Sequence, residues 1–418
     1  MVTTVSPFRG LSVGSSVLRL LVVVLFLLVD SHAFVTTTRR VLIIPRASAT
    51  RTRWWAQQEE KAAAAAVASE ADTPRRSSNT MKVLKGVRDL VDDFDVFLLD
   101  MWGVLHNGSA PYAGVLEAVD RLRQATNKDR NKRLIILSNS SKRVDHSIKM
   151  LRKLGFSDDS FAQIITSGEV AYQILGGNSC FASSSTLSWS KLDKVTSKTA
   201  VVLGSGDQDE EYLQACGWEL TTPDQASLVV ARGTFTINDG TNVVDKRVDG
   251  DQTYDEVLQQ TLQDCAARQL PMLVTNPDKV RPDEGFPPMP GKLGDLYEAA
   301  LQKASEINGA STLNEDPSNL VYRIGKPFAN VYDLALENVE DRSRVCMIGD
   351  ALETDVTGGT RVGIATVWVL MDGIHSDETV QGVADAPRVL QDFQSQSTGT
   401  YAQGIKLVPN YLLSNFQW

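Results

Sequence analysis

Three short runs of apolar residues constrain the fold of this chain more than any other feature. They are Val96 to Leu99 (VFLL), Leu134 to Leu137 (LIIL) and Val345 to Ile348 (VCMI), and each ends in small or polar residues. Uninterrupted apolar runs of this length are typical of parallel strands that are buried on both faces. Between the first two runs, VLEAVDRLRQA has the apolar spacing of an amphipathic helix. The pattern therefore predicts a βαβ unit in an α/β fold with a parallel sheet.

A long segment separates the second run from the third. Between Ser140 and Lys326, the sequences AVVLGSG, SLVVARG and LPMLVTN predict strands, and TYDEVLQQTLQDCAARQ predicts a helix. An inserted domain explains this segment most simply, because it adds a second core without interrupting the first sheet. We expect this domain to span residues 141–271, between two parts of the first domain at 81–140 and 272–418. From Ser376 onward, a helical run and the apolar stretch KLVPNYLL are expected to complete the outer layer of the first domain.

The first eighty residues have the composition of targeting signals. An apolar stretch, LLVVVLFLLV, precedes Ser31-His32-Ala33, which predicts a signal peptide over 1–33 that is cut before Phe34. Ten residues are too few for a lasting membrane span. Residues 34–80 are predicted to be a transit-like segment and linker. Arginines alternate there with hydroxylated residues, and no Asp or Glu occurs up to Gln58. This two-part arrangement resembles the plastid (chloroplast) targeting sequence of algae with secondary plastids, and secretion with a basic propeptide is the alternative.

Charge and cysteine content exclude several classes of partner and site. The chain of 418 residues has a formal net charge of -9, and its basic residues outnumber its acidic ones before residue 81, so the remainder is more acidic still. Nucleic-acid binding needs a basic surface, so no nucleic-acid partner is expected. The 4 cysteines are far apart and form no CxxC pair. Neither a zinc site nor a disulfide framework is therefore predicted.

Polar residues that could carry chemistry follow each of the three apolar runs. They are Asp100 after the first run, Ser138, Asn139 and Ser140 after the second, and Asp350 and Asp355 after the third. The carboxyl ends of parallel strands meet at one edge of a sheet, where open α/β folds bind ligands. Carboxylates gathered there suit Mg²⁺, and Lys326 supplies a cation for the negative charge of phosphoryl transfer. Each residue alone is common in turns and helix caps, so their combined order is what favours a site.

This order of motifs resembles the haloacid dehalogenase-like (HAD) superfamily of hydrolases. DMWGVLHNG, LSNSSKR, GKP and IGDALETD match its four motifs, within about residues 92–375. The insertion between the second and third motifs, with TSGEVA and TNPD near its ends, resembles the class IIA subclass of NagD-like and 4-nitrophenylphosphatase-like enzymes. The resemblance implies a Rossmann-like core with a large inserted α/β cap domain, and the cap allows a homodimer. In TNPDKVRP, Asn276 and Asp278 are expected to line the site entrance or to cap a turn.

The resemblance also implies a role for each matching residue. Asp100 is the expected nucleophile, which forms an aspartyl-phosphate, and Lys326 neutralises it together with the phosphate. Ser138 and the backbone of Asn139 are expected to bind the phosphoryl oxygens. The expected Mg²⁺ ligands are Asp100, the backbone carbonyl of Trp102 and Asp350, with Asp355 in the outer coordination shell. These roles imply a magnesium-dependent phosphatase that acts on a small phosphorylated metabolite.

Trp102 departs from the pattern of the resembling phosphatases. There a second aspartate stands two residues after the nucleophile and protonates the leaving group, a contribution of roughly 10²- to 10⁴-fold. One interpretation is an enzyme that acts on aryl or acyl phosphates, or that uses another side chain as the acid. His106 is the nearest candidate for this acid. A second is a carbon-centred, dehalogenase-like hydrolase, which the paired acids Asp350 and Asp355 disfavour. The third is a catalytically impaired protein of the same fold that has a ligand-binding or regulatory role.

Overall fold

Two β-sheets form the framework of the described part of the chain. The structure, a computed structural model, describes residues 81–418 except 128–129, 178–188, 190–191, 193–194, 196, 207, 282–284, 286, 308–316 and 397–399. The predicted signal peptide (1–33) and the transit-like segment and linker (34–80) lie outside the described residues, so both stay predictions. Among the helices that are described, none has the length and apolar character needed to cross a membrane.

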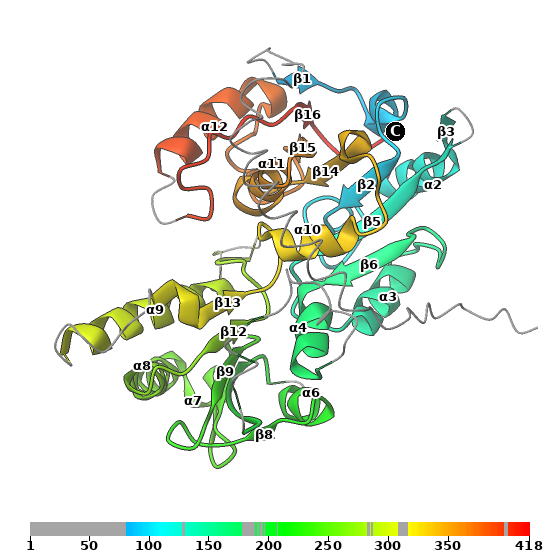
Figure 1. Ribbon diagram of the computed structural model, residues 1–418. Helices are drawn as coiled ribbons and strands as arrows, with labels where there is room; N and C mark the ends of the chain where they lie inside the picture. The colour runs from blue at the N-terminus through cyan, green and yellow to red at the C-terminus, as the bar shows by residue number, and fades with distance from the viewer. Residues whose placement is uncertain are drawn as a thin grey trace, which may run out of the picture. The chain divides into compact units, whose positions relative to one another are not determined.

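The first sheet has seven strands, all paired in parallel, in the spatial order β1-β16-β15-β14-β2-β5-β6 (Figure 1). Its strands are β1 (Lys82–Val83), β2 (Val96–Leu99), β5 (Arg133–Ser138), β6 (Gln163–Thr166), β14 (Val345–Gly349), β15 (Ala365–Val369) and β16 (Tyr411–Leu413). The chain segments that connect or follow them contain α2 (Val115–Gln124), α3 (Val144–Lys153), α4 (Ser167–Leu175), α10 (Ala329–Ala335), α11 (Thr357–Arg361) and α12 (Ala386–Ser395). Shorter elements are η1 (Val87–Leu90), η4 (Arg342–Arg344), η5 (Leu352–Val356), η6 (Gly382–Ala384) and the antiparallel pair of β3 (Thr126–Asn127) and β4 (Arg130–Asn131).

The second sheet is also seven-stranded, but it is mixed. Its spatial order is β11-β10-β7-β9-β12-β13, with β8 paired to β7, and β10 runs antiparallel to both neighbours. Its strands are β7 (Thr199–Gly204), β8 (Glu219–Leu220), β9 (Leu228–Ala231), β10 (Thr236–Asn238), β11 (Val243–Asp245), β12 (Met272–Val274) and β13 (Val321–Arg323). The same stretch of chain contains α6 (Asp209–Ala215), α7 (Lys246–Asp249), α8 (Asp251–Ala267), α9 (Pro290–Ile307) and η3 (Pro317–Leu320).

These elements confirm the predicted α/β class and most of the predicted strands. The run VFLL coincides with β2, and the runs LIIL and VCMI lie within β5 and β14, which flank β2 in the sheet. Every residue of β2 is buried, as expected for a strand covered on both faces. The amphipathic segment between β2 and β5 forms α2, whose buried side includes Val115, Val119 and Leu122. The βαβ unit is thus confirmed.

The strand pairing corrects the predicted boundaries of the inserted domain. Strand β6 pairs with β5, so residues 144–175, which fall inside the predicted insertion of 141–271, belong with the first sheet. Strands β12 and β13 pair with β9 and with each other, so the second sheet extends to Arg323 rather than ending near residue 271. Strand pairing decides to which sheet each short strand belongs, because a short apolar run has the same sequence pattern in either sheet.

The C-terminal stretch also differs from its expected place. The apolar end of the chain forms β16, which lies between β1 and β15 inside the first sheet instead of in an outer layer. The helical run is shorter than expected, since α12 begins only at Ala386. A three-residue strand gives too little periodicity to be told from a packed coil.

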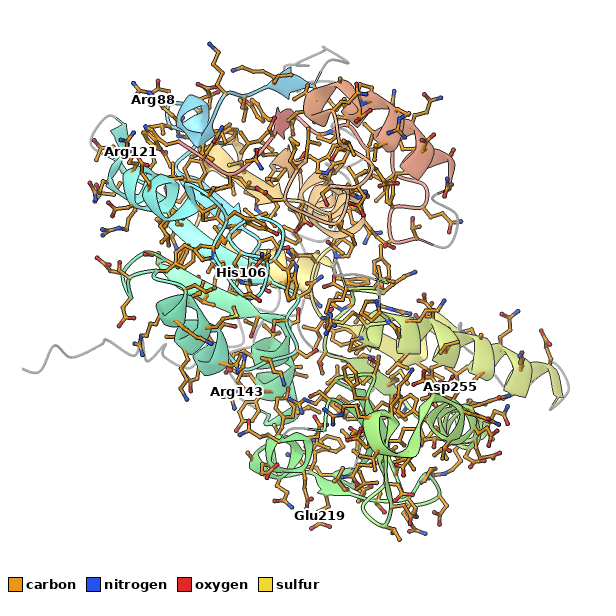
Figure 2. The ribbon with its side chains drawn as sticks, turned by 180° about the vertical axis from the view of Figure 1, so that it is seen from behind. Arg88, His106, Arg121, Arg143, Glu219 and Asp255 are labelled. Atoms are coloured by element: carbon orange, nitrogen blue, oxygen red, sulfur yellow. The ribbon has the colours of Figure 1, made fainter. Side chains whose placement is uncertain are left out.

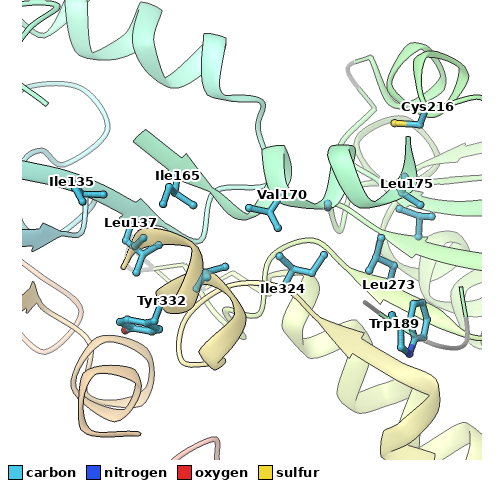
Figure 3. Close-up of a cluster of buried hydrophobic side chains, with 14 of the residues drawn as sticks. Ile135, Leu137, Ile165, Val170, Leu175, Trp189, Cys216, Leu273, Ile324 and Tyr332 are labelled. Atoms are coloured by element: carbon cyan, nitrogen blue, oxygen red, sulfur yellow. The ribbon is translucent and has the colours of Figure 1, made fainter. Parts of the chain in front are cut away.

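One apolar cluster continues from the first sheet into the second. It includes Leu98 of the first sheet and Val202 of the second. Ile135, Leu273 and Ile324 belong to the same cluster (Figure 3). Buried hydrogen bonds run alongside it: the indole Nε1 of Trp218 donates to the carbonyl of Leu175, at 3.0 Å, and the Tyr212 hydroxyl donates to that of Gly168, at 2.9 Å. These contacts hold α6 and the segment that follows it against α4.

Candidate active site

The polar residues predicted at the strand ends do gather at one edge of the first sheet. Asp100 directly follows β2, and its backbone N–H donates to the carbonyl of Ile348 in β14, at 3.0 Å. The neighbouring strands pair in register, so β5 ends in Ser138 on one side of Asp100 and β14 leads into Asp350 on the other. The parallel order β14-β2-β5 therefore brings three separate motifs together.

Lys326 connects two of the carboxylates. Its Nζ lies 2.8 Å from Oδ1 of Asp100 and 2.7 Å from Oδ1 of Asp355, and its side chain is only 1% exposed. Burial alone would lower the pKa of Lys326, but the two carboxylates outweigh it and raise that pKa above its ordinary value. The lysine is thus a permanent cation. Oδ1 of Asp100 also accepts from the N–H of Met101, and Oδ2 of Asp100 has no partner among the described residues.

Three carboxylates fit a divalent cation. Oxygens of Asp100, Asp350 and Asp355 lie within 4.8 Å of one another. Burial, and then the charges of Asp355 and Asp100, raise the pKa of Asp350 well above its usual range. Lys326 alone therefore does not balance the negative charge of the cluster. Hard oxygen donors with surplus negative charge are what Mg²⁺ prefers, so these residues fit the predicted ion. The backbone carbonyl of Trp102 as a further ligand stays a prediction.

Two glycines pack directly against the side chain of Asp350. A Cβ added to Gly103, which has a φ of +81°, would lie 2.3 Å from the carboxyl carbon of Asp350, and one added to Gly373 would lie 2.1 Å from its Cβ. Oδ2 of Asp350 accepts from the N–H of Ile374 at 2.7 Å, and the indole of Trp368 donates to the Asp350 carbonyl at 2.9 Å. The carboxylate is thus fixed in position by its surroundings. No sequence pattern indicated Gly373 or Ile374.

Asn139 forms a clamp that holds the loop of Lys326. Its Oδ1 accepts from the backbone N–H of Lys326 at 2.7 Å, and its Nδ2 donates to the Lys326 carbonyl at 3.0 Å. The same Nδ2 donates to Oδ1 of Asp278 at 2.7 Å. The predicted phosphate-binding role of Asn139 concerned its backbone, so this use of the side chain was missed. The asparagine joins the second motif to the third and to the loop after β12.

Ser138 presents a hydroxyl at the same edge. Its side chain is buried near Asp100, and its Oγ accepts from the N–H of Ser140 at 3.3 Å. Ser167, at the start of α4, donates to the carbonyl of Ser138 at 3.3 Å. The segment TSGEVA contains Ser167, but its sequence alone gave no reason to expect this contact. The arrangement leaves the Ser138 hydroxyl proton available to a phosphoryl oxygen.

The structure does not support His106 as a substitute acid. The imidazole is buried inside the first domain (Figure 2), and its Nδ1 accepts from the N–H of Gly108 at 2.9 Å. Burial lowers the pKa of His106, and the nearby charge of Asp100 offsets this only in part. A neutral imidazole whose Nδ1 is already an acceptor is a poor proton donor at neutral pH. The Trp102 indole lies on the same turn, 6.1 Å from the His106 ring and against Gly108.

Comparisons with known proteins agree with this geometry. Models of the families described as haloacid dehalogenase-like hydrolase and HAD-hydrolase-like match residues 97–219 and 323–395. The chain is 25% identical over 329 residues to a 4-nitrophenylphosphatase of Schizosaccharomyces pombe, covering 76% of this chain and 97% of the relative. It is 26% identical over 301 residues to phosphoglycolate phosphatase 2 of Arabidopsis thaliana, covering 70% and 88%.

A solved structure supports the same fold. It is a possible sugar phosphatase of the HAD superfamily from Cytophaga hutchinsonii, with a TM-score of 0.53 and 19% identity, covering 81% of this chain and 99% of the other. The four motifs, the inserted second sheet and these relatives agree with one another. Residues 97–219 and 323–395 are therefore those of a haloacid dehalogenase-like hydrolase, and the inserted second sheet agrees with the large cap predicted from the resemblance to class IIA.

Proposed function

We propose that this hydrolase is a magnesium-dependent phosphatase that acts on a small phosphorylated metabolite through an aspartyl-phosphate at Asp100. The observation that carries the proposal is the pairing of Lys326 with both Asp100 and Asp355 at the end of β2. One oxygen of Asp100 is held by these contacts, and the other has no protein partner among the described residues. A carboxylate fixed in this way is oriented for attack on a phosphorus atom.

Each residue around Asp100 then has a separate role in the proposed reaction. Lys326 offsets the charge of the carboxylate and of the bound phosphoryl group, and the Ser138 hydroxyl donates to a phosphoryl oxygen. Asp350, with Asp100 and the Trp102 carbonyl, would hold Mg²⁺. Asp355 would lie in the outer coordination shell, as predicted. When bound, this ion would reduce the repulsion between the carboxylate and the phosphate dianion. The inserted domain carries loops toward the site and would exclude bulk water from it.

The relatives suggest the first substrates to try. The Schizosaccharomyces pombe relative is named for an aryl phosphate, and the Cytophaga structure for a sugar phosphate. An aryl phosphate and an acyl phosphate have leaving groups that depart without strong acid assistance, which suits a site with Trp102 beside the nucleophile. We also propose, from the composition of residues 1–80, that the protein works in the plastid.

Hydrolysis of 4-nitrophenyl phosphate and of acetyl phosphate, with and without Mg²⁺, tests the proposal. We expect turnover that needs Mg²⁺ and disappears in the Asp100→Asn variant, because an amide cannot form the acyl phosphate. Asp224→Asn, an exposed position in the inserted domain, is the matched control and should keep full activity. Absence of turnover on both substrates, with Mg²⁺ still bound, would contradict the proposal and favour the ligand-binding alternative.

A further inference from the structure

The place of Trp102 leaves the proposed reaction without a proton donor. An alkyl or sugar phosphate releases a strongly basic alkoxide, so a proton must reach the leaving oxygen as its bond to phosphorus breaks. The indole has no acidic proton to give at neutral pH, and His106 is buried, with its pKa lowered. Any donor must therefore come from another segment of the chain. This question rests on the proposed function.

Asp278 is the carboxyl group that the second sheet brings to this place. It follows β12, and its Oδ1 accepts from the Asn139 side chain at 2.7 Å. Asn139 in turn holds both backbone groups of Lys326, whose ammonium group pairs with Asp100. The side chain of Asn139 therefore connects Asp278 directly to the backbone of the catalytic lysine. Its Oδ2 has no hydrogen-bond partner among the described residues.

The loop that carries Asp278 is held in one conformation. The N–H of Asp278 donates to Oδ1 of Asn276 at 2.8 Å, and its carbonyl accepts from the N–H of Gly291 at 2.9 Å. The Tyr401 hydroxyl donates to the carbonyl of Pro277 at 2.8 Å. A Cβ on Gly291 would lie 2.0 Å from the carbonyl oxygen of Pro277, so the loop packs directly against the backbone of this glycine. Such support preorganises the carboxyl group for a proton transfer.

The surroundings keep a proton on Asp278 near neutrality. Burial raises the pKa of its carboxyl group to about 7, and the charges of Asp100 and Asp355 add to this effect. The hydrogen bond from Asn139 and the charge of Lys326 oppose it. The facing phenol of Tyr401 stays neutral, because burial raises its own pKa further above its ordinary value. A carboxyl group in this range can both give and take a proton at working pH.

We infer that Asp278 is the general acid of this enzyme and takes the place of the aspartate that is absent at position 102. In the first step, Oδ2 of Asp100 forms a bond to phosphorus while the P–O bond to the leaving group breaks, and the proton of Asp278 passes to the departing oxygen. In the second step, water attacks the same phosphorus, the bond to Asp100 breaks, and one proton of the water returns to Asp278. The products are an alcohol and hydrogen phosphate, and both carboxyl groups recover their starting states.

A purely structural role for Asp278 is the competing explanation. Asp278→Asn separates the two, because the amide oxygen still accepts the hydrogen bond from Asn139 but the side chain has no acidic proton. A proton donor matters most for the most basic leaving group, whereas a misplaced clamp would affect all substrates alike. The assay is kcat/KM of the full-length chain on phenyl, 4-nitrophenyl and 2,4-dinitrophenyl phosphate, which form a series of falling leaving-group pKa.

We expect Asp278→Asn to lower kcat/KM on phenyl phosphate by roughly 10²- to 10⁴-fold and on 2,4-dinitrophenyl phosphate by less than about tenfold. The wild-type kcat/KM on phenyl phosphate should also fall as the pH rises above about 7, and this limb should vanish in the variant. An equal loss on all three substrates would overturn the role of Asp278 and leave the proposed phosphatase standing. No hydrolysis of any of them by the wild type would overturn both. Asp224→Asn again serves as the control.

Discussion

Replacing Asn139 with alanine tests the clamp at the centre of the site. The substitution removes the acceptor for the Lys326 N–H and the donor to both the Lys326 carbonyl and Asp278. The backbone of Lys326 is buried, so these groups lose partners that bulk water cannot easily replace. Each buried polar group left without a partner costs about 1 to 3 kcal/mol. With water entering part of the space, we expect a loss of roughly 3 to 5 kcal/mol in the free energy of unfolding.

Urea unfolding measures this loss as a lower midpoint at an unchanged m value. Asn330→Ala is the matched control, because Asn330 is also buried but, within the described part of the chain, its amide forms hydrogen bonds only with its neighbour Val331 and, at 3.5 Å, with the Tyr322 hydroxyl. We expect the control to lose about 1 kcal/mol. A loss in Asn139→Ala no larger than in the control would refute the clamp. The activity of Asn139→Ala should also fall by about 10²-fold, because Lys326 is no longer held in position.

Four further outcomes are expected. Mg²⁺ at a hundredfold excess over its Kd should stabilise the protein by about 2.7 kcal/mol at pH 8 but not in Asp350→Asn, as measured by thermal unfolding. Without Mg²⁺, stability should fall as the pH rises through about 6, because burial raises the pKa of Asp355 to about 6 from 3.8; a flat profile would contradict this. Gly103→Ala should cost about 1 to 3 kcal/mol in urea unfolding and weaken Mg²⁺ binding, since its methyl group meets Asp350 at a φ of +81°. Residues 1–80 fused to a fluorescent protein should direct it to the plastid, and secretion of the fusion would refute the targeting prediction.

The sequence predicted the parts of the site that directly follow buried strands of the first sheet. The apolar runs of β2, β5 and β14 are continuous, and a parallel sheet brings their carboxyl ends together. The sequence pattern therefore predicts that Asp100, Ser138 and Asp350 lie at one edge of the sheet. Lys326, the predicted cation, lies at the same edge, where it pairs with Asp100 and Asp355.

The rest of the site depends on contacts between segments that are distant in the sequence. Asn139 and Lys326 are 187 residues apart, and Asn139 and Asp278 are 139 apart. No local periodicity encodes such pairs, so Asp278 could only be placed near the entrance of the site or in a capped turn. The boundary of the inserted domain was wrong for a similar reason, since β6 and β12 have the same apolar pattern and only pairing assigns each to its sheet.

The buried charges of the site argue for catalysis against a purely ligand-binding role. Asp350, Asp355 and Lys326 are each buried within a few ångströms of Asp100, and removing such groups from water costs several kcal/mol per ion before their mutual attraction is counted. Apolar residues of similar volume would often be neutral or more stable at such positions. A site that only held a phosphate could use backbone N–H groups and a serine. The arrangement here instead fixes one oxygen of Asp100 and leaves the other without a partner among the described residues, as the proposed attack on phosphorus requires and as binding alone does not explain.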